Sequence, residues 1–333
     1  MGGLARGVNG IFVVDKPTGV TSYDVVRKLK RVLFGVKIGY LGTLDPLATG
    51  VLPILLGEGT KLAPFLETGQ KVYEATLHLG VITDTQDREG QILQSVDVGA
   101  YDLSPHKIEE VIGRFRGRIM QLPPMYSALK QKGEPLYKLA RRGEEVERAR
   151  REVEIYALQV TEIAPPYLHL HIECSKGTYI RTVAHDIGGE LGCGAHLAEL
   201  RRMRSGPFCL EDALFLDDIE GLLNTGRLQE RIIPLSEAMG FLPAVEVGEA
   251  DALQIRNGQV IALEGLHHRS EEDGQVVRVL ASKGGGLVAV GGIQREKEGL
   301  VLRPLRVFHD VIFTKRPSCA RDTMHNMADQ GGR

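Results

Sequence analysis

The sequence predicts a soluble protein of mixed helix and strand that carries a small β domain near its C-terminal end. Hydrophobic residues make up 43% of the 333 residues and charged residues 25%, the ordinary proportions of a globular protein. Amphipathic helix patterns and short alternating strand patterns follow one another through the first two thirds of the chain. From about Ala244, short β-like runs separated by glycines replace them, which is typical of a small all-β unit.

The composition also indicates where the protein works. No uninterrupted apolar run approaches the ~18 residues of a membrane span, and residues 1–9 lack the apolar segment of a signal peptide. No C-x-x-C pair is present, so we expect reduced thiols rather than disulfides or zinc, and a cytoplasmic location. The four thiols are Cys174, Cys193, Cys209 and Cys319.

The first predicted elements are a strand and a helix. Residues 10–14 form a short apolar run that is stopped by a turn at Pro17, so they indicate a buried strand. Thr21 and Asp24 have the spacing of a capping box, and Gly35 is placed to end the helix that they begin. The apolar face of this helix consists of Val25, Val26, Leu29, Val32 and Leu33.

Residues 38–50 contain one carboxylate, Asp45, in a loop rich in glycine. Asp45-Pro46 is a turn-forming pair, because proline disfavours helical geometry in the residue before it. An acid at a fixed, exposed point of such a loop serves either as a turn cap or as a reactive group. The residues alone favour the turn cap, because capping acids are common and reactive acids are rare.

Two predicted strands carry polar side chains of interest. Residues 71–80 alternate so that Tyr73 shares a face with apolar residues, which indicates a core tyrosine. A second alternating strand places His169, His171 and Glu173 on one face. A metal site there is disfavoured, because no cysteine or carboxylate cluster completes the ligands.

The net charge of −2 gives no sign of a nucleic-acid partner, but the basic residues are unevenly distributed. Eleven of them fall between residues 114 and 151, where we weigh only four glutamates against them. Such an excess suits contact with a phosphate backbone, and it equally suits a solvated surface. The eleven are Arg114, Arg116, Arg118, Lys130, Lys132, Lys138, Arg141, Arg142, Arg148, Arg150 and Arg151.

The residues from 175 to 208 predict a helix that follows a glycine turn and has a basic end. On this interpretation Arg181 is one more surface charge. Residues 313–333 are polar and end in Gly-Gly-Arg, so we expect a disordered tail there.

The stretch from Gly39 to Gly50, Gly-Tyr-Leu-Gly-Thr-Leu-Asp-Pro-Leu-Ala-Thr-Gly, resembles the catalytic motif of the TruB family of pseudouridine synthases. One position departs from that motif, because Tyr40 stands where the family usually has histidine. Further segments resemble the family in the right order, and the resemblance covers roughly residues 9–210. They are Val-Val-Asp-Lys-Pro with Gly-Val-Thr-Ser near the N-terminus, residues 83–90, residues 121–143 and residues 175–208.

The resemblance implies an α+β fold in which helices flank a mixed, mostly antiparallel central sheet, the pseudouridine synthase fold. A catalytic domain would span residues 1–240, with a thumb insertion at about 121–152 that closes on the ligand. A small PUA-like, RNA-binding β domain would span residues 244–312, before the tail at 313–333.

The resemblance also implies the activity, which is isomerisation of the T-loop uridine of tRNA, at position 55, to pseudouridine. Asp45 would be the nucleophile, Arg181 its guanidinium partner, and Tyr73 would stack on the uracil. Base flipping is expected, because the uridine is unreachable inside a folded loop. The substrate-binding positions would be Tyr40 at the opened loop, Tyr179 and Leu200 around the base, and Lys16 and Lys61 near phosphates.

The uridine supplies both fragments of this reaction, so neither a metal nor an organic cofactor is required. We expect a monomer that acts on tRNA without a guide RNA and without a membrane. An RNA-guided enzyme of the dyskerin type is one alternative, although Leu47-Ala48 and the long insertion favour the standalone type. An RNA-binding protein or tRNA chaperone without turnover is another, against which the intact set of Asp45, Tyr73 and Arg181 argues.

Overall fold

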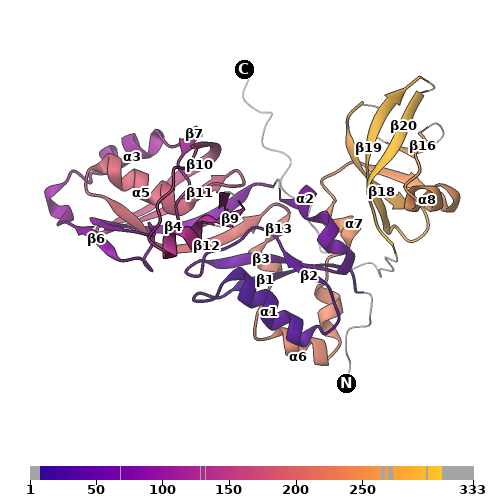
Figure 1. Ribbon diagram of the computed structural model, residues 1–333, viewed down its shortest axis with the longest axis horizontal. Coiled ribbons are helices and arrows are strands. Elements are labelled where there is room, and N and C mark those ends of the chain that lie inside the picture. The colour runs from indigo at the N-terminus through magenta and orange to yellow at the C-terminus, as the bar shows by residue number, and fades with distance from the viewer. Residues whose placement is uncertain are drawn as a thin grey trace, which may run out of the picture.

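The computed structural model describes residues 8–309, apart from residues 68, 128, 132, 264–266, 269–272 and 298. Two large β-sheets dominate it, one across the left and centre of Figure 1 and the other at the upper right. The tail predicted at 313–333 lies outside the described residues, and Cys319 lies there too. Cys174 and Cys193 are buried free thiols.

The larger sheet contains ten of the described strands. They are β1 (Gly10–Lys16), β2 (Ile38–Tyr40), β3 (Thr49–Leu56), β4 (Lys71–Leu79), β7 (Gly117–Gln121), β10 (Arg151–Ala164), β11 (Tyr167–Cys174), β12 (Ala195–Ser205), β13 (Phe208–Cys209) and β14 (Ala213–Phe215). Their order is β14-β1-β3-β12-β4-β11-β10-β7, with β2 beside β3 and β13 beside β12. All pairings are antiparallel except β1 with β14 and β3 with β12, which confirms the predicted mixed, mostly antiparallel sheet.

The two halves of this sheet meet at β12. That strand pairs with β4 along most of its length, but with β3 only at Arg201–Thr49 and Arg202–Gly50. Gly50 has a φ of +99°, and a Cβ atom there would lie 2.2 Å from the carbonyl oxygen of Arg202. Only glycine therefore allows β3 and β12 to approach so closely.

Among the described helices, α1 (Ser22–Val32), α3 (Pro105–Gly113), α5 (Ile180–Leu191) and α6 (Ile219–Asn224) contribute to the core of the larger sheet. The predicted capping box of α1 is confirmed, since Thr21 and Asp24 exchange hydrogen bonds between side chain and backbone. The apolar face predicted for α1 is buried in the same core. In Figure 1, α3 and α5 lie at the left of the sheet and α1 lies below its centre.

The alternation predicted for residues 71–80 is also confirmed. In β4, Tyr73, Leu77 and Leu79 are buried in the core, whereas Glu74 and Thr76 are half-buried on the opposite face. The core tyrosine predicted from the pattern alone is therefore present.

The helix predicted across residues 175–208 is wrong in its second half. Helix α5 ends at Leu191, where Gly192 caps it with a φ of +84°, and the chain returns as strand β12. Two β-bulges in β12, after Leu197 and after Arg202, interrupt its pairing with β4. They break the two-residue alternation by which a strand is recognised, so the sequence resembles a helix. Arg181 is not a surface charge either, because it is 3% exposed.

The insertion predicted at about 121–152 corresponds to the segment between β7 and β10. It contains a two-stranded hairpin of β8 (Lys130–Gln131) and β9 (Glu134–Pro135), followed by the short helix α4 (Leu136–Arg141). The shorter elements elsewhere are η1 (Gly57–Leu62), α2 (Ala63–Leu66), β5 (Val81–Thr83), β6 (Ile92–Ser95), η2 (Val98–Ala100), η3 (Leu210–Asp212), α6 (Ile219–Asn224), η4 (Arg227–Arg231) and α7 (Leu235–Ala238).

The second sheet follows the order β16-β20-β19-β18-β15-β17. Its elements are β15 (Ala244–Val247), α8 (Glu249–Arg256), β16 (Ile261–Ala262), β17 (His267–His268), β18 (Val276–Ala281), β19 (Leu287–Glu296) and β20 (Gly299–Val307). Phe308 and Val290 from this part pack with Leu62 and Leu66 in a shared apolar cluster. The second sheet is therefore attached to the first domain through a buried apolar contact.

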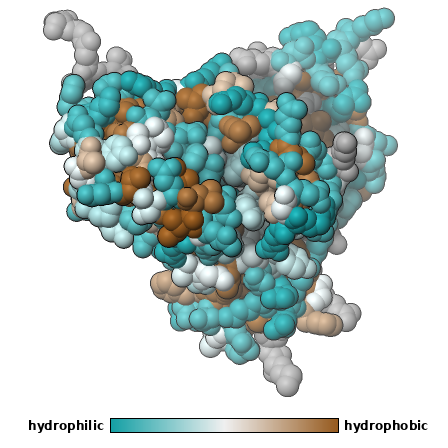
Figure 2. All heavy atoms as spheres, turned by 60° about the vertical axis from the view of Figure 1, so that its left-hand side comes forward, coloured by the Kyte–Doolittle hydropathy of each residue, from teal (hydrophilic) through white to brown (hydrophobic). Residues whose placement is uncertain are grey.

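The face that Figure 2 brings forward is mainly hydrophilic, with hydrophobic residues gathered in small separate patches. Among the described helices, none is long and apolar enough to cross a membrane.

Candidate active site

The loop between β2 and β3 holds Asp45 and is fixed at several points of its backbone. Ser22, the first residue of α1, accepts a hydrogen bond from the Leu44 N–H at 2.8 Å, and its hydroxyl donates to the Leu44 carbonyl at 3.1 Å. The Ala48 N–H donates to the Asp45 carbonyl at 3.1 Å, which closes the predicted turn. The N-terminal segment that resembles the family therefore holds the Asp45 loop in place.

Lys16 also supports the Asp45 loop. Its side chain is completely buried, and Nζ donates to the carbonyls of Pro17, Val20 and Pro46 at 2.9, 2.6 and 3.2 Å. Burial lowers the pKa of Lys16 to about 8. The Lys16 ammonium therefore lies among backbone carbonyls beside Asp45, and its approach to a phosphate stays a prediction that RNA binding must test.

Asp45 and Arg181, which are 136 residues apart in sequence, form a two-point contact. Arg181 Nε donates to Asp45 Oδ2 at 2.7 Å, and Arg181 Nη2 donates to Asp45 Oδ1 at 3.3 Å. The arginine side chain is 4% exposed, whereas the aspartate side chain is 34% exposed. A buried fork therefore orients a carboxylate that remains open to solvent.

Arg181 is itself held by further acceptors. Its Nη1 and Nη2 donate to the carbonyls of Thr85 and Tyr126 at 3.0 and 2.9 Å. Asp87 Oδ2 lies 3.6 Å from Arg181 Nε. The pKa of Asp87 is raised by burial, which outweighs its hydrogen bond from Thr85 and the nearby Arg181.

Sequence reasoning missed Asp87, because it lies in the polar segment 83–90, which has the composition of a turn. The side chain is nevertheless buried, and it accepts the Thr85 hydroxyl at 2.6 Å and the Glu89 N–H at 3.0 Å. The resemblance of 83–90 to the family was the signal that could have singled it out.

Tyr73 lies on β4, 8% exposed, and forms a hydrogen bond with the buried Arg202 of β12. Burial raises the pKa of the Tyr73 phenol. Arg202 was not predicted as part of a site. It connects Tyr73 with the Asp45 loop, since Arg202 Nη2 donates to the Gly42 carbonyl at 2.9 Å.

Tyr179 and Leu200, both expected around the base, lie near these groups. Tyr179 precedes α5, and Gln121 of β7 binds its backbone on both sides, at 2.8 Å to the N–H and 3.0 Å to the carbonyl. The pKa of the Tyr179 phenol is raised by burial. Leu200 is buried on β12 opposite Ala75 of β4.

Tyr40 and Lys61 occupy different surroundings. Tyr40 is the last residue of β2 and packs, half-buried, against the core that contains Leu44 and Leu47. Lys61 lies in η1, where Nζ contacts Glu58 at 2.6 Å and donates to the Val307 carbonyl at 3.2 Å. Its contacts thus join the first domain to the second sheet, and its role at phosphate stays a prediction.

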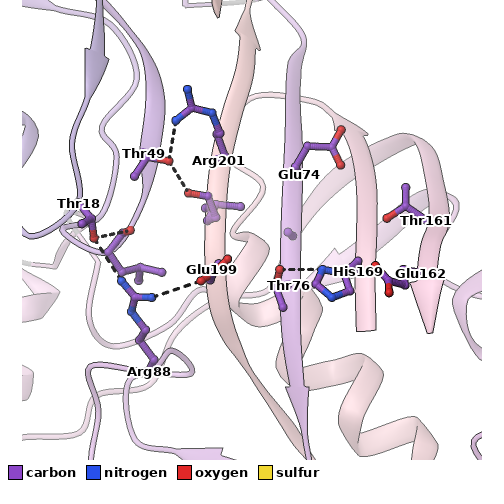
Figure 3. Close-up of a pocket in the computed structure, with 13 residues that line it drawn as sticks. Thr18, Thr49, Glu74, Thr76, Arg88, Thr161, Glu162, His169, Glu199 and Arg201 are labelled. Atoms are coloured by element: carbon purple, nitrogen blue, oxygen red, sulfur yellow. Dashed lines mark hydrogen bonds and ion pairs between the residues drawn. The ribbon is translucent and has the colours of Figure 1, made fainter. Parts of the chain in front are cut away.

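A cavity of about 630 Å³ lies beside the Asp45 loop (Figure 3). Thr18 and Leu47 form one side of it, and the Thr18 hydroxyl donates to the Leu47 carbonyl at 3.2 Å. Arg88 lies between Thr18 and Glu199 and contacts both of them in this view. Asp45 and Arg181 are not among its lining residues. The full lining is Thr18, Leu47, Thr49, Glu74, Ala75, Thr76, Arg88, Thr161, Glu162, His169, Glu199, Leu200 and Arg201.

The histidine-rich strand face is arranged as hydrogen-bonded pairs. His171 contacts Glu74 at 2.7 Å, which is the main reason that its pKa is raised, and His169 contacts Thr76 at 3.1 Å. In the part of the chain that the structure describes, no group of three potential ligands is placed to hold a metal ion.

Many of the eleven basic residues of 114–151 have acidic partners. Arg114 contacts Glu110 and Glu190, and Arg142 contacts Glu134 and Glu144, all at 2.5–2.7 Å. Arg141 instead lies 5.6 Å from the Tyr137 ring centre. Exposed pairs of this kind are weak, so they leave both the phosphate and the solvated-surface interpretation open.

Comparison with known proteins adds an independent line of information. Residues 30–180 match a family model described as TruB family pseudouridylate synthase (N terminal domain), and residues 181–239 match one described as tRNA pseudouridylate synthase B C-terminal domain. The tRNA pseudouridine synthase B of Geobacter sulfurreducens is 48% identical over 261 residues, which are 78% of this chain and 85% of the relative. That of Syntrophus aciditrophicus is 44% identical over 314 residues, 91% of this chain and 99% of the relative.

Two solved structures share the fold. An H/ACA RNP bound to a substrate RNA containing 2'-deoxyuridine has a chain with a TM-score of 0.70 and 28% identity. A Cbf5-Nop10-Gar1 complex has one with a TM-score of 0.70 and 30% identity. Each comparison covers 90% of this chain and 85% of the other.

Proposed function

Because this chain belongs to the TruB family of pseudouridine synthases, we propose that it isomerises the T-loop uridine of tRNA, at position 55, to pseudouridine. The family is one of isomerases that act on RNA uridine. Relatives named tRNA pseudouridine synthase B, at 42–49% identity, support the choice of tRNA. The observation that carries the proposal is the exposed Asp45 carboxylate held by the buried Arg181 fork.

The proposed chemistry uses Asp45 as the nucleophile. In this isomerisation the C1′–N1 bond breaks, the uracil turns, and a C1′–C5 bond forms, while C5 loses a proton and N1 gains one. A carboxylate suits this role because it can form and release a covalent bond without an external reactant. The two hydrogen bonds from the Arg181 fork point the oxygens of Asp45 in a fixed direction.

Base flipping is part of the proposal. The Asp45 side chain is 34% exposed, whereas Tyr73 and Leu200 are almost completely buried. A uridine would therefore have to leave its own loop to reach Asp45, and Tyr73 would then stack on the ring while Leu200 and Tyr179 enclose it. The segment between β7 and β10 would act as the thumb that closes on the RNA, since its Tyr126 carbonyl already contacts Arg181.

The proposed division of the chain into domains is the one that the family resemblance implies. We assign catalysis to residues 1–240 and RNA binding to the β domain of 244–312. The enzyme would act as a cytoplasmic monomer on tRNA alone.

The test is to incubate the purified chain with an unmodified tRNA transcript and no other macromolecule. Pseudouridine is then mapped by carbodiimide-blocked primer extension, with a transcript that carries cytidine at position 55 as the control. One stop that depends on the T-loop uridine supports the proposal. Tight binding without any stop supports an RNA-binding protein or tRNA chaperone instead.

A guided enzyme is the second candidate, because both structural neighbours come from assemblies described as an H/ACA RNP or as a complex of Cbf5, Nop10 and Gar1. Modification that appears only when a guide RNA is added would favour it. The higher identity to relatives named tRNA pseudouridine synthase B favours the first candidate.

A further inference from the structure

Arg202 is the largest fully buried side chain in the described part of the chain, with 1% of its surface exposed. It lies where the two halves of the larger sheet join. On one side it is paired with Gly50 of β3, and on the other with Tyr73 of β4. Its side chain therefore lies between the strand that follows the Asp45 loop and the strand that carries Tyr73.

The guanidinium of Arg202 contacts both ends of the Asp45 loop. Nε donates to the Val51 carbonyl at 2.7 Å, and Nη2 donates to the Gly42 carbonyl at 2.9 Å and to Leu41 at 3.5 Å. The chain leaves the contact at Gly42, passes through Asp45 and returns to it at Val51. The rigid, planar guanidinium thus binds the backbone on both sides of Asp45, at Gly42 and at Val51.

The same group binds the phenol of Tyr73. A guanidinium carries only donors, so the Tyr73 oxygen is the acceptor in this bond and its O–H proton remains available for another partner. The bond also limits rotation of the phenol away from β12.

Burial of the Arg202 charge carries a desolvation penalty. Among the described residues, no carboxylate forms an ion pair with Arg202, which is compensated by carbonyl oxygens and one phenol. Two further buried cations, Lys16 and Lys71, lie close enough for Arg202 to lower their pKa values. An apolar side chain would avoid this penalty, so the benefit of Arg202 must come from holding several acceptors in one plane.

We propose that Arg202 is a positioning residue that sets the distance and angle between the Asp45 loop and the Tyr73 ring. This inference rests on the proposed function. A displacement of the order of 1 Å between reacting groups slows catalysis about a hundredfold, so the effect is measurable in the rate.

The test compares Arg202→Lys, which keeps the charge and loses the fork, with Arg202→Met, which loses both. Arg204→Met is the matched control, because Arg204 lies on the same strand, its side chain is 41% exposed, and it contacts Gln70 and Glu173 rather than the Asp45 loop. Thermal unfolding establishes which variants are folded. For both Arg202 variants we expect a 10- to 100-fold lower single-turnover rate on the tRNA transcript and RNA affinity within about threefold of the unsubstituted chain. The control should keep both.

A double-mutant cycle with Tyr73→Phe separates positioning from a general structural role. If Arg202 acts partly through the Tyr73 hydroxyl, Arg202→Lys should cost at least threefold less in the Tyr73→Phe background. The assignment is overturned if the rate losses of Arg202→Lys and Tyr73→Phe simply multiply in the double variant. It is also overturned if a folded Arg202 variant keeps the unsubstituted rate, or if neither Arg202 variant folds.

A readout without turnover distinguishes this proposal from the proposed function. Tyrosine labelled with ¹³C at Cζ reports each phenol by NMR, and Tyr73→Phe identifies the signal of Tyr73. Loss of the neighbouring cation in Arg202→Met should shift the Tyr73 titration to higher pH. If the unsubstituted chain forms no pseudouridine, the proposed function fails. The titration shift would still support the Arg202–Tyr73 contact, and an unshifted Tyr73 titration in Arg202→Met would overturn that contact.

Discussion

Asp87 Oδ2 lies 3.6 Å from Arg181 Nε, the same nitrogen that donates to Asp45 at 2.7 Å. The buried arginine is therefore shared between an exposed carboxylate and a buried one. Because Asp87 also contacts Arg181, the orientation of the guanidinium should be retained even when Asp45 engages a substrate.

Asp87 gives the first prediction, because its pKa is raised by burial. The folded state then binds a proton more tightly than the unfolded state, so the unfolding free energy of the chain falls as pH rises through the window between the ordinary and the raised pKa. Asp87→Asn should remove that slope. Urea unfolding of both proteins from pH 4 to pH 7 measures it, and parallel curves would contradict the assignment.

Asp45→Asn should abolish pseudouridine formation while RNA affinity changes little. Asparagine keeps the size of the side chain and one acceptor for Arg181, but it is not a nucleophile. Single-turnover assays and filter binding on one transcript provide the two numbers. Substantial turnover in a preparation free of unsubstituted enzyme would rule out Asp45 as the nucleophile.

Lys16→Met should affect stability rather than RNA binding, because within the described residues the ammonium donates its hydrogen bonds to backbone carbonyls. The pKa of Lys16 is lowered to about 8 from 10.5, so the unfolded state binds the proton more tightly between these values. The unsubstituted chain should therefore gain stability over Lys16→Met as pH rises from 8 to 10, by at most about 1.4 kcal/mol per unit. A change in the salt dependence of RNA binding would instead place Lys16 at a phosphate.

Replacing Arg141 and Arg142 together with glutamine should flatten the log–log dependence of RNA affinity on salt. The slope should fall by about 0.7–0.9 for each phosphate that the protein no longer neutralises. Arg142 already contacts Glu134 and Glu144, so most of the change should come from Arg141. Lys107→Gln is the control, because Lys107 of α3 lies outside the basic stretch and pairs with Glu110 at 3.0 Å. An unchanged slope would identify the basic stretch as a solvated surface.

Tyr40→Phe should be nearly neutral, whereas Tyr40→Ala should slow single turnover and weaken binding. In the part of the chain described, the Tyr40 hydroxyl makes no hydrogen bond, and the ring packs against the core beside the Asp45 loop. A planar ring can stack on a base, which contributes about 1–3 kcal/mol. Equal damage by both variants would show that the hydroxyl matters and that the stacking account is wrong.

Elements with local signals were predictable from the sequence. The capping box of α1 and the alternation of β4 depend on neighbouring residues, and both are confirmed. The family resemblance added the fold and brought Asp45 and Arg181 together, which no local pattern could do.

The remaining features depend on contacts between distant segments. The bulges of β12 hid its strand character. Burial of Lys16, Asp87 and Arg202 could not be predicted, because their partners are mostly backbone carbonyls, N–H groups and hydroxyls, and such partners leave no mark on the sequence.

The contact between β3 and β12 also means that the Asp45 loop meets its partners only after much of the chain has been translated. Asp45 leaves the ribosome early, but Arg202 joins the carbonyl of Val51 across 151 residues of chain, and Arg181 joins Asp45 across 136. Closing loops of that length is slow, and neither partner exists until most of the first domain has been translated. The nascent N-terminal half therefore contains Asp45 without its Arg181 partner until Arg181 has been translated.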